Sequence, residues 1–89
     1  MNEIKRKKLA EKIFDGLEIL MCNLYARWQD EKEYEDFEDY IHLVKNKLKE
    51  FKVTFLKMTK RPFCVHYELD GVTYVIFVNS RQYGYKRVA

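Results

Sequence analysis

Residues 63–78 read FCVHYELDGVTYVIFV, and this stretch decides the fold. Apolar residues alternate with other residues on both sides of Asp70-Gly71, which is typical of two adjacent strands. Asp-Gly between such runs favours a type I′ turn, because both central residues of that turn need a positive φ. The turn also sets the register and predicts four facing pairs: Leu69 with Val72, Tyr67 with Tyr74, Val65 with Ile76, and Phe63 with Val78. We assign the face that these side chains share to the hydrophobic core.

The second face of this hairpin is apolar for a surface that meets water. It should carry the alternate residues of both strands, namely Cys64, His66, Glu68, Thr73, Val75 and Phe77. Such a face needs a partner, a second subunit or the C-terminal tail to cover it. We predict a homodimer through this face, with an interface formed by Cys64, His66, Val75 and Phe77.

Residues 51–58 alternate in the same way and predict a third strand, followed by a break at residues 59–62. The register of this first hairpin is open. Either Leu56 and Met58 or Val53 and Phe55 should join the second face. The predicted strands are therefore about 51–58, 63–69 and 72–79, with residues 80–89 as a C-terminal tail.

Before residue 51 the apolar residues recur every three or four positions, which predicts helices. The first, at about 4–28, has an apolar stripe made of Ala10, Ile13, Leu17, Leu20, Leu24 and Trp28. Gly16 interrupts this stripe without changing its phase, which indicates one helix with a kink or with a close approach to a neighbour.

A second helix is predicted at about 31–49, with Asp30 as its N-cap and Glu33 as its capping-box partner. Its apolar face consists of Tyr34, Phe37, Ile41, Val44 and Leu48. The connection between the helices is very short, so they should form an antiparallel hairpin. The sequence thus predicts one α+β domain over residues 1–89, in which a helical hairpin packs on one face of a three-stranded antiparallel sheet, in ααβββ order.

Composition limits the class of protein. Of the 89 residues 47% are hydrophobic and 16% aromatic, which excludes a disordered chain. No stretch reaches the roughly 20 apolar residues of a membrane-spanning helix, and no apolar run follows the charged start. The chain has only two cysteines, which in a reducing compartment are most simply buried thiols. We expect a cytoplasmic protein without a membrane partner, located in the host cytoplasm if a virus encodes it.

Two patterns are candidate chemical sites, one for zinc and one for cysteine–histidine catalysis. Cys64 and His66 project to one face of a strand and supply half of a zinc site, which Cys22 or His42 could complete. No closely spaced ligand pair of the CxxC kind preorganises a metal, so we expect no metal. Glu68 could orient a cysteine–histidine pair, but three residues along one strand line up rather than converge. No glycine-rich phosphate loop occurs either. We expect no catalytic residues, no cofactor and no enzyme.

Residues 30–39 contain seven acids and one lysine. Acids are typical of the first turn of a helix, so a capped and solvated helix start explains part of this run. Seven acids exceed what capping requires. The alternative is an anionic surface that docks onto a basic groove of a partner protein and is formed by Glu31, Glu35, Asp36, Glu38 and Asp39.

The charge of +3 is unevenly distributed along the chain. Residues 1–50 carry a net charge of −2 and residues 51–89 a net charge of +5. Basic residues interleaved with aromatic ones suit single-stranded nucleic acid, because cations bind phosphates and rings stack on bases. An alternative nucleic-acid surface is therefore formed by Lys60, Arg61, Arg81, Tyr83, Tyr85, Lys86 and Arg87.

The function predicted from these features is that of a small non-enzymatic protein-binding domain. In size, compactness and split charge the chain resembles the small inhibitors that phages and other mobile elements encode, anti-CRISPR proteins among them. That resemblance rests on overall character and not on a motif. It implies inhibition of a host defence protein or of a protein that handles nucleic acid. The alternatives are a nucleic-acid-binding module and a toxin–antitoxin component.

Overall fold

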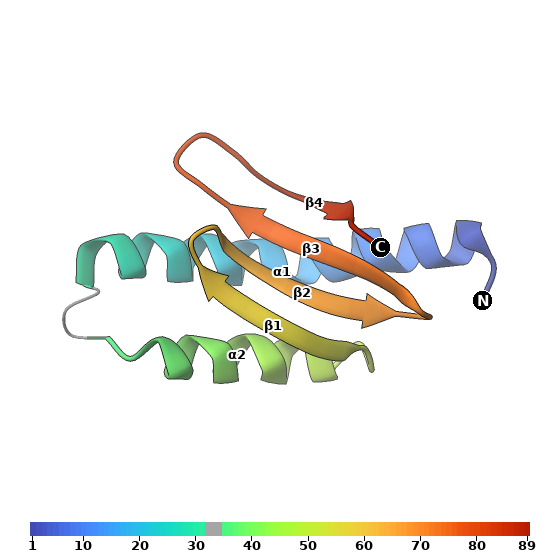
Figure 1. Ribbon diagram of the computed structural model, residues 1–89, viewed down its shortest axis with the longest axis horizontal. Helices are drawn as coiled ribbons and strands as arrows, with labels where there is room; N and C mark the ends of the chain where they lie inside the picture. Colours follow the sequence, from blue (N-terminus) through green and yellow to red (C-terminus); the bar gives the residue numbers. More distant parts are fainter. Residues whose placement is uncertain (32–34) are drawn as a thin grey trace.

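The computed structural model describes residues 1–31 and 35–89, which form an antiparallel sheet backed by two helices (Figure 1). The elements are α1 (Glu3–Glu31), α2 (Phe37–Lys49), β1 (Thr54–Lys60), β2 (Phe63–Leu69), β3 (Val72–Val78) and β4 (Tyr83–Arg87). The sheet order is β1-β2-β3-β4, and each strand pairs with its neighbour in sequence. Both helices lie on one side of the sheet (Figure 1). The α+β class is confirmed, but the predicted number of strands is wrong.

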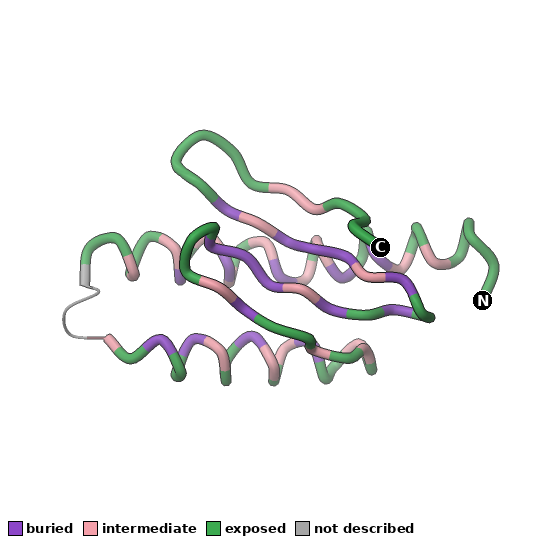
Figure 2. Tube along the Cα trace, viewed as in Figure 1, coloured by how far each residue is buried: buried purple, intermediate pink, exposed green. Residues whose placement is uncertain are grey.

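The central hairpin forms as the sequence predicts. Asp70 and Gly71 have φ angles of 53° and 76°, the positive values that the turn requires. All four predicted pairs of facing residues occur in β2 and β3. Their eight side chains are buried beneath the helices (Figure 2). Local turn chemistry therefore fixes the centre of the sheet.

The segment predicted as a C-terminal tail contains β4, which pairs with β3 from Val78 opposite Tyr83 to Tyr74 opposite Arg87. The Asn79 side chain prepares this return of the chain. Its oxygen accepts the backbone N–H groups of Arg81 and Gln82, both at 2.9 Å. The alternation within β4 spans only five residues, which is too short to separate a strand from a tail by sequence pattern.

Strand β1 begins at Thr54 and ends at Lys60, so the predicted range 51–58 is displaced. A bulge between Phe55 and Lys57 changes the register. Phe55 lies opposite Tyr67 and Met58 lies opposite Val65, so both face the helices. Neither predicted register is right, because each assumed an unbroken alternation. Leu56, the extra residue in the bulge, is 44% exposed.

The helices also differ from the prediction at their junction. Helix α1 continues through Asp30 to Glu31, so the predicted N-cap at Asp30 is wrong. Helix α2 begins at Phe37, and Asp36 is its N-cap. The Asp36 carboxylate accepts the backbone N–H of Glu38 at 3.0 Å, which satisfies one of the donors left open at a helix start. The predicted positions of Glu33 and Tyr34 lie outside the described residues.

Gly16 marks a close approach to a neighbour. A Cβ atom added to Gly16 would lie 2.6 Å from Cζ of the Phe51 ring. Phe51 follows α2 and is packed against the core. The missing side chain of Gly16 therefore lets the chain after α2 pack directly on α1. This explains why a glycine interrupts the apolar stripe of the first helix.

Candidate binding hollow on the open face of the sheet

The face of the sheet that carries no helix is called the open face below. Strand alternation and register place the following side chains on it: Lys57 and Thr59 of β1, Cys64, His66 and Glu68 of β2, Thr73, Val75 and Phe77 of β3, and Lys86 of β4. The four residues of the predicted interface, Cys64, His66, Val75 and Phe77, therefore share one surface. They occupy the two central strands.

Burial on the open face differs from the expectation. Cys64 is 2% exposed and Val75 is 4% exposed, although no helix covers them. Val75 is flanked by its cross-strand neighbours His66 and Lys86, and Lys86 belongs to residues 80–89, the C-terminal segment predicted as one possible cover of this face. Phe77 is partly exposed, and its ring leans over Gly84 on the neighbouring strand. A Cβ at Gly84 would meet Cζ of Phe77 at 3.1 Å.

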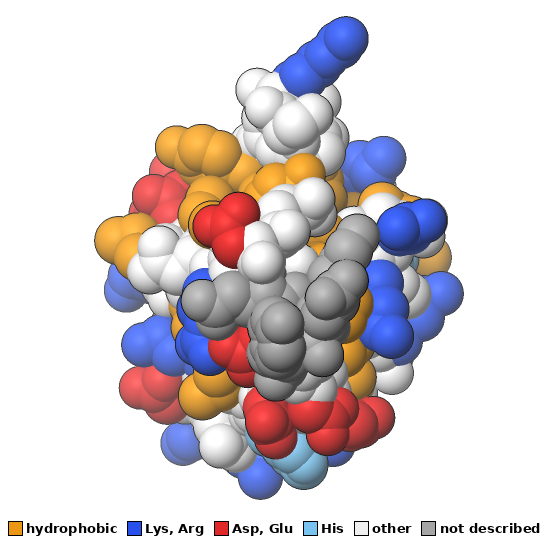
Figure 3. Space-filling view, turned by 90° about the vertical axis from the view of Figure 1, so that its left-hand side faces the viewer, with side chains coloured by type: hydrophobic (Ala, Val, Ile, Leu, Met, Phe, Trp, Pro, Cys, Tyr) orange, Lys and Arg blue, Asp and Glu red, His pale blue; other side chains and the backbone are white. Residues whose placement is uncertain are grey.

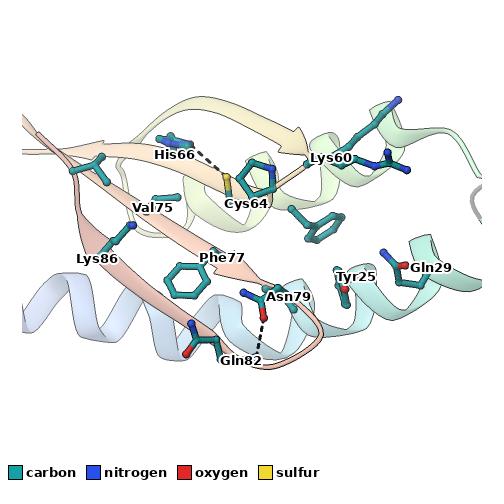
Figure 4. A pocket seen from close by; sticks show the side chains of 15 residues that line it. Tyr25, Gln29, Lys60, Cys64, His66, Val75, Phe77, Asn79, Gln82 and Lys86 are labelled. Atoms are coloured by element: carbon teal, nitrogen blue, oxygen red, sulfur yellow. Dashed lines mark hydrogen bonds between the residues drawn. The ribbon is translucent and has the colours of Figure 1, made fainter.

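These side chains form the floor of an open hollow of about 680 Å³ (Figure 4). Cys64, Val75 and Phe77 line its apolar centre. The hollow extends around the end of the sheet to the last turns of α1, which contribute Tyr25 and Gln29. Such a combination of an apolar floor and a few polar groups is typical of a binding site.

The rim of the hollow is basic. Lys60, Arg61 and Lys86 line it, and no aspartate or glutamate does so among the described residues. Lys57 lies beside it, opposite His66 in the β1–β2 pairing. Partial burial and, secondarily, the Lys57 ammonium lower the pKa of the His66 imidazole below its ordinary value. The hollow therefore presents positive charge to a ligand.

The cysteine at the floor takes part in a small polar cluster. Its Sγ lies 3.3 Å from Thr59 Oγ1. It also lies 3.9 Å from His66 Nδ1, the contact drawn as a dashed line in Figure 4. The Thr59 hydroxyl donates to the Pro62 carbonyl at 2.6 Å, so its oxygen can accept from the thiol. This cluster gives the floor one polar position.

The other candidate metal ligands lie elsewhere. Cys22 belongs to α1 on the covered side of the sheet, and burial, with Glu18 nearby, raises the pKa of its thiol. His42 lies exposed on α2. Within the described parts of the chain, no three His, Cys, Asp or Glu side chains converge as a metal site requires.

The predicted nucleic-acid surface is divided by the sheet. Tyr83 and Tyr85 face the helix side, where their ring centroids lie 6.3 and 4.9 Å from that of Phe14. Burial, followed by the nearby carboxylates of Glu11 and Asp15, raises the pKa of Tyr85. Lys86 points to the opposite face. The structure thus separates the tyrosine rings from the cation that the prediction placed beside them.

The four remaining cations of that set have four different locations. Arg61 lies exposed in the β1–β2 turn, and Arg81 lies exposed in the loop before β4. Arg87 shares the helix side with the two tyrosines. The Lys60 ammonium lies 5.3 Å from the Trp28 ring centroid and 5.4 Å from that of Phe37, which holds it at the end of the sheet. Only Lys60, Arg61 and Lys86 border the hollow.

The predicted acidic surface lies where α1 ends and α2 begins, and Figure 3 shows acidic side chains along the lower edge of that end. Two of its acids have structural contacts. Glu35 is hydrogen-bonded to Arg27, and Asp36 caps α2. Glu38 and Asp39 are exposed. The side chain of Glu31 lies outside the described residues, so the structure gives a helix start with two solvated acids.

Sequence reasoning missed the amides of the hollow, Gln29, Asn79 and Gln82. Gln29 comes from the end of α1, and the other two come from the loop before β4. No local pattern places residues so far apart in one site. Asn79 could have been found, because an asparagine after a strand is a frequent turn former.

Comparison with known proteins yields no relative for this chain. No family model, curated protein or solved structure matches it. In the described part of the chain, neither helix combines the length and the apolar character that crossing a membrane requires. The function is therefore inferred from the site itself.

Proposed function

We propose that this protein is a small non-enzymatic binding domain that docks onto a partner protein through the hollow of its open face. One observation carries the proposal: an apolar floor and a basic rim, with no carboxylate among the described lining residues, occur together in a single concave site. Protein interfaces combine an apolar centre with a polar rim in this way.

In this proposal the protein acts by occupying a surface of its target. Inhibition of a host defence protein, or of a protein that handles nucleic acid, agrees with the size of the chain and with its split charge. Proteins that bind nucleic acid have basic surfaces, and acidic side chains compete for such surfaces. Besides the hollow, Glu38 and Asp39 would form a second contact, with a basic surface of the target. We place this interaction in the cytoplasm of a host cell.

The homodimer remains a separate prediction. The burial of Cys64 and Val75 within one chain leaves less apolar surface for a second copy to cover. Phe77 and the exposed Val88 remain available at the hollow. Sedimentation at tens of micromolar tests this prediction, and a monomer at that concentration would exclude the dimer.

Affinity capture with matched variants tests the docking proposal. The tagged protein is incubated with a lysate of the source or host cell, washed in moderate salt and treated with nuclease. We expect one captured protein that resists nuclease and is lost with Phe77→Glu. Leu43→Glu, which places the same charge at a 44% exposed leucine of α2, should retain it. Retention by Phe77→Glu would show that docking does not use the hollow.

The alternative, a nucleic-acid-binding module, is an outcome of the same experiment. Arg61 and Lys86 at the rim favour it, whereas the position of Tyr83 and Tyr85 on the other side of the sheet opposes it. Recovery of nucleic acid that disappears on nuclease treatment, with no captured protein, would support the alternative. Binding would then fall steeply as salt is raised.

A further inference from the structure

We infer that the hollow binds an extended acidic segment of a partner protein, in which carboxylates flank one large apolar side chain. This inference rests on the proposed docking function and names the chemistry of the partner. It is carried by the distribution of charge around the hollow, by its amides and by its apolar floor.

The charges require an anionic partner. Lys86 belongs to β4 and Arg61 follows β1, so these two cations reach the hollow from opposite edges of the sheet. Lys60 also lines the hollow, but its ammonium lies against the Trp28 and Phe37 rings. The nearest acid on the open face, Glu68, does not line the hollow. A segment laid across the floor would meet Lys86 at one end and Arg61 at the other, and the described residues that line the hollow include no carboxylate. Complementary charge of this kind sets partner choice and register.

The uncharged groups fit a polypeptide. Gln29 and Gln82 line the hollow and offer amide donors and acceptors, which suit a peptide backbone. Asn79 is already engaged, because its oxygen accepts the N–H groups of Arg81 and Gln82 and so holds the loop that carries Gln82. Phe77 also lines the hollow and offers a partly exposed ring against which one apolar side chain can pack.

The arrangement of rings disfavours nucleic acid as the occupant. Single-stranded nucleic acid needs several rings beside the cations, so that successive bases can stack. Tyr83 and Tyr85 pack toward Phe14 on the covered side. Tyr25 and Phe63 also line the hollow, but they pack edge to face on each other, with ring centroids 5.5 Å apart. Phe77 is thus the phenyl ring that the open face itself offers, which suits one apolar side chain better than a row of stacked bases.

Nuclear magnetic resonance titration of the full-length, ¹⁵N-labelled protein tests the inference directly. The probe is a blocked peptide in which glutamates flank a single phenylalanine. The same peptide with glutamines in place of glutamates is the control, and a short oligothymidine is the competing class. We expect the acidic peptide to shift the amide signals of His66, Val75 and Phe77 and to bind at least about tenfold more tightly than both other probes. The inference is overturned by absent shifts at about 1 mM peptide, by equal binding of the glutamine peptide, or by preference for oligothymidine.

Charge-reversal variants separate a local site from an effect of net charge. Arg61→Glu with Lys86→Glu should weaken the acidic peptide at least about tenfold. Lys5→Glu with Lys12→Glu changes the net charge equally, at exposed positions of α1, and should leave binding unchanged. Equal losses in the two double variants, or no loss in the first, would contradict the inference.

The failure of this inference can be told apart from the failure of the docking proposal. If Phe77→Glu loses the captured partner and the Arg61/Lys86 reversal retains it, docking at the hollow stands and the acidic chemistry is wrong. If Phe77→Glu retains the partner, the docking proposal itself is wrong.

Discussion

The two faces of the sheet are buried in different ways. On the covered face, helices α1 and α2 shield whole rows of side chains, including Tyr67 and Ile76 at 0% exposure. On the open face, burial is confined to Cys64 and Val75 at the centre and comes from neighbours on the sheet itself. The covered face therefore supplies stability, whereas the open face keeps a polar rim that is available for recognition.

Adjacent residues of β3 give the largest test of this comparison, because Ile76 points to the covered face and Phe77 to the open one. Ile76→Ala should lower the free energy of unfolding by about 2–5 kcal/mol, since it leaves a cavity in the core. Phe77→Ala should cost about 1–2 kcal/mol, because part of the ring already meets water. Urea denaturation measures both. If Phe77→Ala lowered the free energy of unfolding more than Ile76→Ala, the open face would contribute to stability as much as the core does.

Gly16 and Gly84 each lie close to a phenylalanine ring, one on each side of the sheet, and so extend the comparison. Gly16→Ala should cost about 1–3 kcal/mol, because the new methyl group meets the Phe51 ring and outweighs the gain in helix propensity. Replacing Phe51 by leucine in the same chain should recover part of that loss. Gly84→Ala should change stability by no more than about 0.5 kcal/mol, since the partly exposed Phe77 ring can move aside. Equal effects at the two glycines would contradict the difference between the faces.

The buried hydroxyl of Tyr67 tests whether polar groups on the covered face are hydrogen-bonded. Tyr67 stacks on Tyr74 with ring centroids 5.7 Å apart, and burial raises the pKa of its hydroxyl. Within the described residues, that hydroxyl has no hydrogen-bond partner. Tyr67→Phe should therefore raise the free energy of unfolding by about 1 kcal/mol, because an unpaired polar group is removed from the core. Thermal and urea unfolding measure this change. A decrease in the free energy of unfolding would show that the Tyr67 hydroxyl is hydrogen-bonded in the folded protein.

The smallest effect concerns pH and the open face. The pKa of His66 is lower in the folded protein than in the unfolded chain, so the unfolded chain takes up the proton first. The free energy of unfolding should therefore fall as pH drops below about 6.5, until the imidazole is protonated in both states. Comparing wild type with His66→Gln between about pH 7.5 and pH 5 isolates this contribution. His42→Gln, at an exposed position, is the control, and equal pH profiles for wild type and His66→Gln would refute the prediction.

How far the fold could be predicted depended on whether the signal was local. Asp70 and Gly71 are residue types that readily adopt the positive φ angles of the turn. The central hairpin could therefore be predicted from residues 63–78 alone. The start of α2 did not follow, because the acidic run offers several residues able to cap a helix. In the structure Asp36 is the cap, and its carboxylate accepts the backbone N–H of Glu38. Strand β4 and the bulge at Leu56 were missed because pairing with a neighbouring strand determines both.

The candidate site shows the same division. Alternation along β2 and β3 was enough to place Cys64, His66, Val75 and Phe77 on one face. It could not show that Val75 is buried, because that depends on Lys86 of a strand that the sequence did not reveal. The amides of Gln29 and Gln82 join the hollow only through the tertiary arrangement of α1 and the last loop.

The contact of Phe14 with Tyr85 has a consequence for the order of folding. Every strand pair joins neighbours in sequence, so the sheet can grow by closing short loops. The packing of the first helix on the last strand closes a loop that includes most of the chain, and such contacts form slowly. We therefore expect β4 to dock late and to open first. Its backbone amides should exchange with solvent sooner than those of β2.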